Sequence, residues 1–354
     1  MYRLIRPFLF RIDPETAHAL TLYVLRFTGA LLPLNWAISK FFNAPEKPVL
    51  AFGLTFRNPI GLAAGYDKDA VAVRGLAALG FGHVEVGTIT PCPQEGNPRP
   101  RLFRLVEDQA VINRMGFPGR GAEYVARRLL RHPGRPHGSP LQNRVTRNDT
   151  VIGVNLGKNI DTPLENAAED YLSLMRTFNQ RTGAGMPLAD YLVINVSSPN
   201  TVGLRRLQGR DMLEKLLDQI AVERGAWSVK RPILVKLAPD LSDEELDDAI
   251  DAIIHTSMDG IIATNTTLGR EGLQSRHREE AGGLSGSPLR DRSEAVLREV
   301  VKRVAGRIPV VSAGGIMTPE DAKRRLDMGA ALVQVFTGLV YAGPGLVQKI
   351  IRLV

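Results

Sequence analysis

Residues 308–338 read IPVVSAGGIMTPEDAKRRLDMGAALVQVFTG, and this stretch decides the fold. Two short β-branched runs, Pro309 to Ala313 and Ala331 to Phe336, flank a helical stretch, and such βαβ units build parallel sheets. The first run ends in Gly314-Gly315 and the second in Thr337-Gly338. Glycines there let backbone N–H groups approach an anion, so the two loops predict the phosphate site of a (β/α)8 barrel. Glycines that serve turn geometry alone are the alternative.

The same alternation extends back to Pro48 and gives eight strand-like runs. The six earlier ones are Ile60 to Ala64, His83 to Gly87, Val151 to Leu156, Tyr191 to Val196, Ile233 to Leu237 and Gly260 to Thr264. Polar or glycine residues follow each run at once. Because all C-terminal strand ends of a closed parallel barrel open on one face, we predict an α/β fold, a (β/α)8 TIM barrel with its chemistry at that face. A doubly wound open sheet, the rival architecture, would use only one crevice.

The composition is typical of a folded globular protein, with 354 residues, 44% hydrophobic and 23% charged. The single cysteine, Cys92, excludes an internal disulfide, and the scattered histidines show no metal-ligand spacing, so we expect no metal. Part of the net charge of +8 lies near the N-terminus, which favours a lipid surface. A basic loop from Arg131 to Arg147 lacks stacking aromatics; we interpret it as a solvated insertion and expect no nucleic-acid partner.

Residues 1–45 predict an amphipathic helical segment ahead of a barrel that spans residues 46–354. Asp13-Pro14 is typical of a helix start, and apolar residues recur behind it at helical spacing: Ala17, Leu20, Val24, Phe27 and Leu31. The uncharged run from Phe27 to Ser39 is too short to span a membrane, and no secretory signal precedes it. We expect these helices to lie on a membrane surface; packing on the outer wall of the barrel is the alternative.

Ten short motifs occur in an order and spacing that resemble the quinone-linked class of dihydroorotate dehydrogenases. They are GLAAGYDKD, EVGTITP, PRLFRL, NRMGF, GVNLGKN, INVSSPNT, VKLAPDL, IATNTT, GGLSG and SAGGI. The resemblance covers nearly the whole chain. It implies oxidation of (S)-dihydroorotate to orotate by FMN in de novo pyrimidine biosynthesis, with a membrane quinone as electron acceptor. It also implies a peripheral protein on the cytoplasmic face of the cell membrane.

Carried over residue by residue, the resemblance implies the site. The FMN contacts are Ala64, Gly65, Tyr66, Asp67, Lys68, Thr88, Asn155, Asn195, Lys236, Thr264, Gly286, Gly315, Phe336 and Thr337. The substrate clamp comprises Lys68, Asn113, Arg114, Met115, Gly116, Phe117, Asn195, Asn200, Asn265 and Thr266. Ser198 removes the C5 proton while a hydride passes from C6 to the flavin, and His18 and Arg104 line the quinone side. The soluble class has cysteine where this chain has Ser198.

The residue types also suit these roles on chemical grounds. Asparagine amides donate and accept around a planar uracil-like ring, and Lys68 offers positive charge to an anionic ligand. Lys236 ends a strand inside the barrel, where an ammonium needs a partner. No acid stands among the strand ends, so we expect that partner to be a flavin, which gains negative charge on reduction. Phe336 and Tyr66 replace the tyrosine and the smaller aliphatic residue common in the family, and both bear on quinone geometry.

Two other functions compete with this interpretation. A tRNA-dihydrouridine-type flavin barrel predicts a catalytic cysteine after a strand and a C-terminal RNA-binding domain, and the sequence shows neither. A non-catalytic barrel that binds lipid or nucleic acid would leave the ten ordered motifs unexplained.

Overall fold

A closed barrel of eight parallel strands forms the centre of the computed structural model, which describes residues 2–130, 150–181, 187–201 and 203–354. Around the barrel the strands are β3 (Ile60–Leu62), β4 (His83–Ile89), β7 (Val151–Leu156), β8 (Tyr191–Asn195), β9 (Ile233–Leu237), β10 (Gly260–Ala263), β12 (Val310–Ala313) and β13 (Leu332–Val335). They coincide with the eight predicted runs, so the predicted barrel is confirmed. The basic loop from Arg131 to Arg147 lies outside the described residues.

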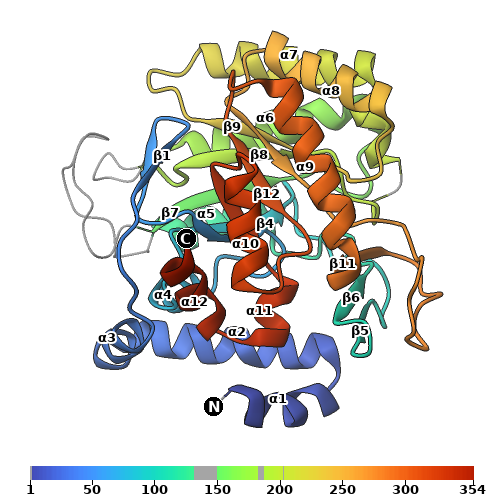
Figure 1. The fold of residues 1–354 in the computed structure, drawn as a ribbon. Coiled ribbons are helices and arrows are strands. Elements are labelled where there is room, and N and C mark those ends of the chain that lie inside the picture. The colour runs from blue at the N-terminus through green and yellow to red at the C-terminus, as the bar shows by residue number, and fades with distance from the viewer. Residues whose placement is uncertain (1, 131–149, 182–186, 202) are drawn as a thin grey trace.

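Helices pack around the outside of the barrel (Figure 1). They are α4 (Val73–Ala78), α5 (Gly121–Leu130), α6 (Ala167–Asn179), α7 (Arg210–Gly225), α8 (Asp243–His255), α9 (Arg290–Val304), α10 (Pro319–Asp327), α11 (Thr337–Ala342) and α12 (Gly345–Leu353). The sequence encodes two of the helix starts directly. Ser242 with Glu245 and Thr318 with Asp321 form reciprocal capping boxes, which satisfy the free N–H groups at the starts of α8 and α10.

The N-terminal end of the barrel is closed by a hairpin of β1 (Val49–Ala51) and β2 (Leu54–Phe56). Leu54 and Phe56 belong to one buried apolar cluster with Tyr191 and Leu332, the first residues of β8 and β13. Apolar packing therefore seals this end, and only the C-terminal end is left for a ligand.

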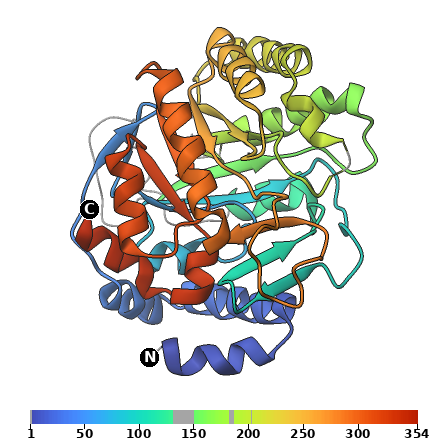
Figure 2. The same ribbon diagram turned by 45° about the vertical axis from the view of Figure 1, so that its right-hand side comes forward.

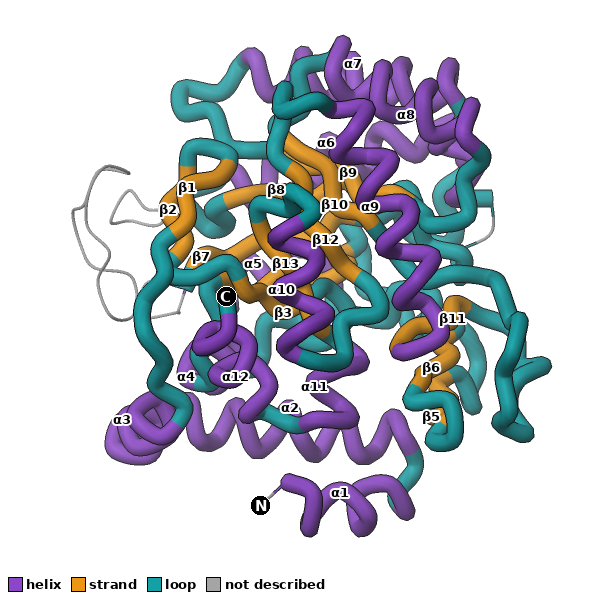
Figure 3. Tube along the Cα trace, in the orientation of Figure 1, coloured by secondary structure: helices purple, strands orange, loops and turns teal. Residues whose placement is uncertain are grey.

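A small antiparallel sheet stands beside the C-terminal end of the barrel (Figure 3). It contains β5 (Leu102–Leu105) and β6 (Ala110–Asn113) from the loop after β4, and β11 (Gly283–Gly286) from the loop after β10. The register sets Asn113 opposite Gly283. The sheet thus fixes two long loops that the sequence analysis left without structure.

Three helices precede the barrel: α1 (Tyr2–Arg11), α2 (Pro14–Ala30) and α3 (Leu32–Phe41). Asp13 caps α2 as predicted, because its Oδ1 accepts the backbone N–H of Thr16 at 2.9 Å. Figures 1 and 2 show α1 and α2 side by side along the edge of the molecule that carries α11. Among the described helices, none alone is long and apolar enough to cross a membrane. Only α2 and α3 taken together have the length and apolar composition of a membrane span, and the two helices meet at a bend of 109°.

Glycines bring α2 very close to α4. A Cβ built on Gly75 of α4 would lie 2.1 Å from the carbonyl oxygen of Leu25 in α2. A Cβ on Gly29 of α2 would lie 2.7 Å from the nitrogen of Gly75. The inner face of α2 is therefore packed against the barrel wall, while α1 has no buried residue.

Candidate active site

A cavity of about 560 Å³ opens at the C-terminal end of the barrel, a volume suited to a cofactor or small ligand. Its walls come from the barrel loops, the small sheet and the N-terminal helices. We call two parts of it the polar end and the apolar arm. The polar end comprises Lys68, Thr88, Asn113, Asn195, Ser198, Asn200, Lys236, Asn265 and Thr266. The apolar arm comprises Ile5, Leu9, Phe10, Ala17, Leu20, Val24, Leu25, Tyr66, Phe336, Leu339 and Val340.

Most residues that the sequence analysis selected line this one cavity, as does Ser198. The exceptions are Asp67, Arg114 and Asn155. The Asp67 carboxylate accepts the backbone N–H groups of Val71 and Ala72, both at 2.8 Å, ahead of α4. Arg114 pairs with Glu280 at 2.6 Å, and Asn155 lies beneath the cavity floor. These three residues therefore do not line the cavity, and their contacts support the segments around it.

The amide groups at the polar end are held by one another. Asn195 Nδ2 donates to Thr88 Oγ1 at 2.9 Å, and Asn200 Nδ2 donates to Asn113 Oδ1 at 3.0 Å. Asn265 Nδ2 donates to Ser197 Oγ at 3.0 Å. Residues 68 to 107 positions apart in sequence thus meet at the polar end, as the strand-end pattern predicts.

Two lysines supply positive charge to the cavity. Desolvation lowers the pKa of both Lys68 and Lys236. Within the described part of the chain, Lys236 makes no ion pair, but the charge of Glu85 acts on it and opposes the lowering of its pKa. Glu85 lies buried within β4 and not at a strand end, so the strand-end pattern does not reveal it. The sequence does contain a signal for Glu85 as a candidate, because a carboxylate in the middle of a barrel strand needs a polar partner.

Ser198 lies in the loop after β8 and is 4% exposed. Its Oγ accepts the backbone N–H of Asn200 at 3.2 Å, which is a loop-capping contact. Arg205 fixes the same loop: its Nε donates to the carbonyl of Ser197 at 3.1 Å and its Nη2 to the carbonyl of Thr266 at 2.8 Å. Arg205 joins two loops of the site and was not selected from the sequence.

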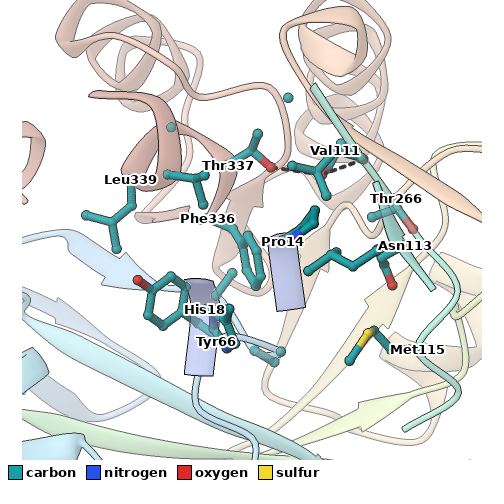
Figure 4. Close-up of a pocket in the computed structure, with 18 of the residues that line it drawn as sticks. Pro14, His18, Tyr66, Val111, Asn113, Met115, Thr266, Phe336, Thr337 and Leu339 are labelled. Carbon is teal, nitrogen blue, oxygen red and sulfur yellow. Dashed lines mark hydrogen bonds between the residues drawn. The ribbon is translucent and has the colours of Figure 1, made fainter. Parts of the chain in front are cut away.

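Aromatic rings line the junction between the apolar arm and the rest of the cavity. The ring of Tyr66 meets His18 edge-to-face at 4.8 Å and Phe336 at 5.5 Å between centroids. Burial lowers the pKa of His18 to about 3, so its imidazole is neutral. Figure 4 shows these rings facing Asn113, Met115 and Thr266 across the cavity.

Arg104 connects the small sheet to α1. Its guanidinium lies 4.8 Å from the ring centroid of Phe10 and donates to the carbonyl of Leu9 at 3.3 Å. Both His18 and Arg104 line the cavity, on the side where the sequence analysis expected a quinone.

The glycine loops after β12 and β13 form a further part of the wall. Gly315 has φ +71°, and a Cβ there would lie 2.3 Å from the Cα of Arg290. Thr337 Oγ1 lies 2.8 Å from Ser285 Oγ of the small sheet. Because α11 has only six residues, an anion here would depend on loop N–H groups and hydroxyls more than on a helix dipole.

Comparisons with known proteins agree with this geometry. A family model described as dihydroorotate dehydrogenase matches residues 48–354. The dihydroorotate dehydrogenase (quinone) of Thermus thermophilus is 50% identical over 95% of this chain and 91% of its own length. That of Halorhodospira halophila is 46% identical over 99% of this chain and 97% of its own.

Solved structures give the same answer. The crystal structure of DHODH from Eimeria tenella in complex with ferulenol has a TM-score of 0.84 and 38% sequence identity, and the match covers 96% of this chain and 90% of that one. The ligand-free form from the same organism has a TM-score of 0.83. The resemblance seen in ten motifs is thus confirmed over the whole fold, and the chain belongs to the quinone-dependent dihydroorotate dehydrogenases, flavin enzymes that oxidise dihydroorotate in pyrimidine biosynthesis.

Proposed function

We propose that this one cavity performs both half-reactions, with FMN as the flavin, dihydroorotate at the polar end and the quinone entering through the apolar arm. The observation that carries the proposal is the division of a single cavity into a hydrogen-bonded end and an apolar end. The Lys236 ammonium, buried and without an ion pair among the described residues, suits a cofactor ring that becomes negative. One glycine-rich wall, at Gly314 and Gly315, suits the single phosphate of FMN.

At the polar end, the side chains bind, orient and deprotonate the substrate. The substrate carboxylate and ring are held by Lys68 and by the amides of Asn113, Asn195, Asn200 and Asn265. Ser198 takes the C5 proton from a site screened from water, which a weakly basic hydroxyl needs. When bound against Lys236 and the glycine loops, FMN would supply the acceptor for the C6 hydride and the electrons for the quinone.

The outer faces of α1, α2 and α3 suit contact with a membrane. Large apolar side chains there are exposed: Leu4, Phe8, Tyr23, Phe27, Leu32, Trp36 and Phe41. Arg3, Arg11 and Arg26 stand among them and would attract anionic lipid. These features support our proposal that the protein lies on the cytoplasmic face of the cell membrane, where the apolar arm would receive a quinone directly from the lipid.

The cofactor proposal is tested by heating the purified protein and separating the released flavin by chromatography. We expect about one FMN per chain, because one phosphate wall is available. Recovery of FAD, or folded protein without flavin that still oxidises dihydroorotate, would overturn it.

The membrane proposal is tested by sedimentation with vesicles of anionic and neutral lipid. Changing Phe8→Ser together with Trp36→Ser should lower the partition onto anionic vesicles by at least about tenfold, since each side chain buries apolar area in the interface. Leu50→Ser is the matched control, because Leu50 is 74% exposed on the hairpin at the closed end of the barrel. An equal loss of vesicle binding in the double variant and in Leu50→Ser would mean that the N-terminal helices are not the membrane-binding surface.

A further inference from the structure

A chain of hydrogen bonds between buried amides runs from the barrel interior to the polar end. Asn155 Nδ2 donates to Glu85 Oε1 at 2.8 Å, and Asn195 Nδ2 donates to Asn155 Oδ1 at 3.0 Å. Asn265 Nδ2 in turn lies 3.4 Å from Asn195 Oδ1. Thr88 joins the same chain, since its Oγ1 donates to Asn155 Oδ1 at 2.6 Å. Each amide donates toward Glu85 and accepts from the side of the cavity.

Glu85 gives this chain its direction. Its carboxylate has no exposed surface and also accepts a hydrogen bond from Gln334 Nε2 at 2.7 Å. The charge of Glu85 also acts on the buried Lys236 ammonium. A carboxylate only accepts hydrogen bonds, whereas a carboxamide turned by 180° exchanges donor and acceptor. One orientation of Asn155 is therefore allowed, and it selects the orientation of the next amides.

We propose that Glu85 is a positioning residue for the substrate: acting through Asn155, it fixes which atoms of Asn195 and Asn265 face the bound ring. The inference rests on the proposed substrate clamp and adds the group that sets its orientation. An amide turned the wrong way presents an acceptor where the ring needs a donor. Such a mismatch in a buried site weakens binding by about 10- to 100-fold.

The test measures the dissociation constant of orotate for the flavin-loaded protein, followed by the change in flavin absorbance. Asn155→Asp sets a second carboxylate opposite Glu85 and replaces their hydrogen bond with repulsion. The displaced side chain no longer holds an acceptor against Asn195 Nδ2, so we expect orotate to bind at least about tenfold more weakly at pH 8. Two facing carboxylates share a proton as the pH falls, and the protonated one donates again. Affinity should therefore recover toward pH 6, a dependence that a purely structural defect would not show.

The decisive variant combines Glu85→Gln with Asn155→Asp, which exchanges donor and acceptor and keeps the total charge. The hydrogen bond between positions 85 and 155 is restored with its donor and acceptor exchanged, and position 155 again accepts from Asn195, so orotate affinity should return to within about threefold of the original at both pH values. Tyr191→Phe is the matched control: the Tyr191 hydroxyl is 3.4 Å from Glu85 but outside the amide chain. Its orotate affinity should stay within about twofold of the original.

A double variant that binds orotate as weakly as Asn155→Asp, or that cannot retain flavin, overturns the proposal, as does unchanged affinity in Asn155→Asp at pH 8. Loss of flavin in the single variant with recovery of flavin and orotate binding in the double variant supports it. Asn265→Leu distinguishes an error in the proposed substrate clamp from an error in the proposed role of Glu85. If it leaves orotate affinity unchanged, the clamp itself is wrong; if it weakens orotate while the double variant fails, the clamp stands and Glu85 does not orient it.

Discussion

The polar end and the apolar arm of the cavity are held together in different ways. At the polar end, the amides, hydroxyls and buried carboxylate hydrogen-bond to one another, which orients the amides, and Arg205 fixes two of the loops through backbone carbonyls. In the apolar arm the contacts are between rings and aliphatic groups, and α1 buries no residue. The difference indicates that the cavity is preorganised at the end proposed to bind the substrate and adaptable at the end proposed to admit the quinone.

The largest effect that would separate the two ends is expected from Ser198→Ala. Loss of the base should slow flavin bleaching by dihydroorotate by at least about 100-fold, the low end for removal of a general base. Orotate affinity should change little, and reoxidation of the flavin by quinone should be unaffected. Ser198→Cys should be partly active. Rapid mixing follows each step separately, and the original protein should bleach faster as the pH rises because a hydroxyl is a weak base.

Near-normal bleaching in Ser198→Ala would remove the serine from the mechanism and leave only the loop-capping contact with Asn200. A loss of orotate affinity equal to the loss of rate would assign Ser198 to binding.

A pH dependence of stability compares a histidine beside the arm with one at the closed end of the barrel. Burial lowers the pKa of both His18, which contacts Tyr66, and His83, which contacts Phe56, to about 3. Both are neutral when folded but titrate near 6.5 when unfolded, so their stabilisation is complete above about pH 6.5 and is lost as the pH falls toward 3. From pH 7 to pH 5 each should cost about 2 kcal/mol of unfolding free energy.

Denaturant unfolding at the two pH values measures this loss. His18→Leu should remove about half of the combined loss that the two histidines cause, because one of the two buried imidazoles is gone. If the acid sensitivity of the variant equals that of the original protein, His18 is not a buried neutral histidine.

Removal of residues 1–12 tests the arm alone. The deletion takes away Ile5, Leu9 and Phe10 from the cavity wall but removes no buried residue of α1. We expect the KM for a long-chain quinone to rise by about tenfold, which corresponds to the loss of roughly one apolar side chain of contact. Flavin content and bleaching by dihydroorotate should be retained. Unchanged quinone kinetics would show that α1 does not form part of the quinone site.

The smallest effect is expected from Phe336→Tyr, which adds one hydroxyl beside Tyr66. Its influence on the KM for quinone should be about threefold, the size of one modest hydrogen bond gained or lost. Bleaching by dihydroorotate should not change. A changed bleaching rate would place this ring against the substrate and weaken the division of the cavity into two ends.

The sequence was sufficient to predict the barrel because each strand is a short apolar run followed by a polar or glycine residue. Thr88, Asn195 and Lys236 could be assigned to one face on that basis, and the structure brings them to one cavity. The structure also shows that the two alternatives for the N-terminal helices are compatible. The inner face of α2 packs on α4, and its outer face stays exposed. The division into residues 1–45 and 46–354 stays a prediction.

Other features could not be read from local patterns. Glu85 and Asn155 are 70 residues apart, and only barrel closure makes them partners. Arg205 donates hydrogen bonds to two backbone carbonyl groups in different loops. Because every residue has such a carbonyl, no residue type in the sequence marks these partners. The small antiparallel sheet escaped prediction because its strands are short and belong to two separate insertions.

The close crossing of Gly29 and Gly75 also bears on the space inside the arm. Val24 and Leu25 of α2 line the arm, and backbone contact at this crossing sets how close α2 lies to α4. Alanine at position 75 would force α2 outward, because its Cβ would overlap the carbonyl of Leu25. A chain with a larger residue there would admit bulkier arm-binding compounds, although the changed residue would touch none of them. We therefore expect the size of ligand that the arm accepts to depend on a helix crossing outside the arm itself.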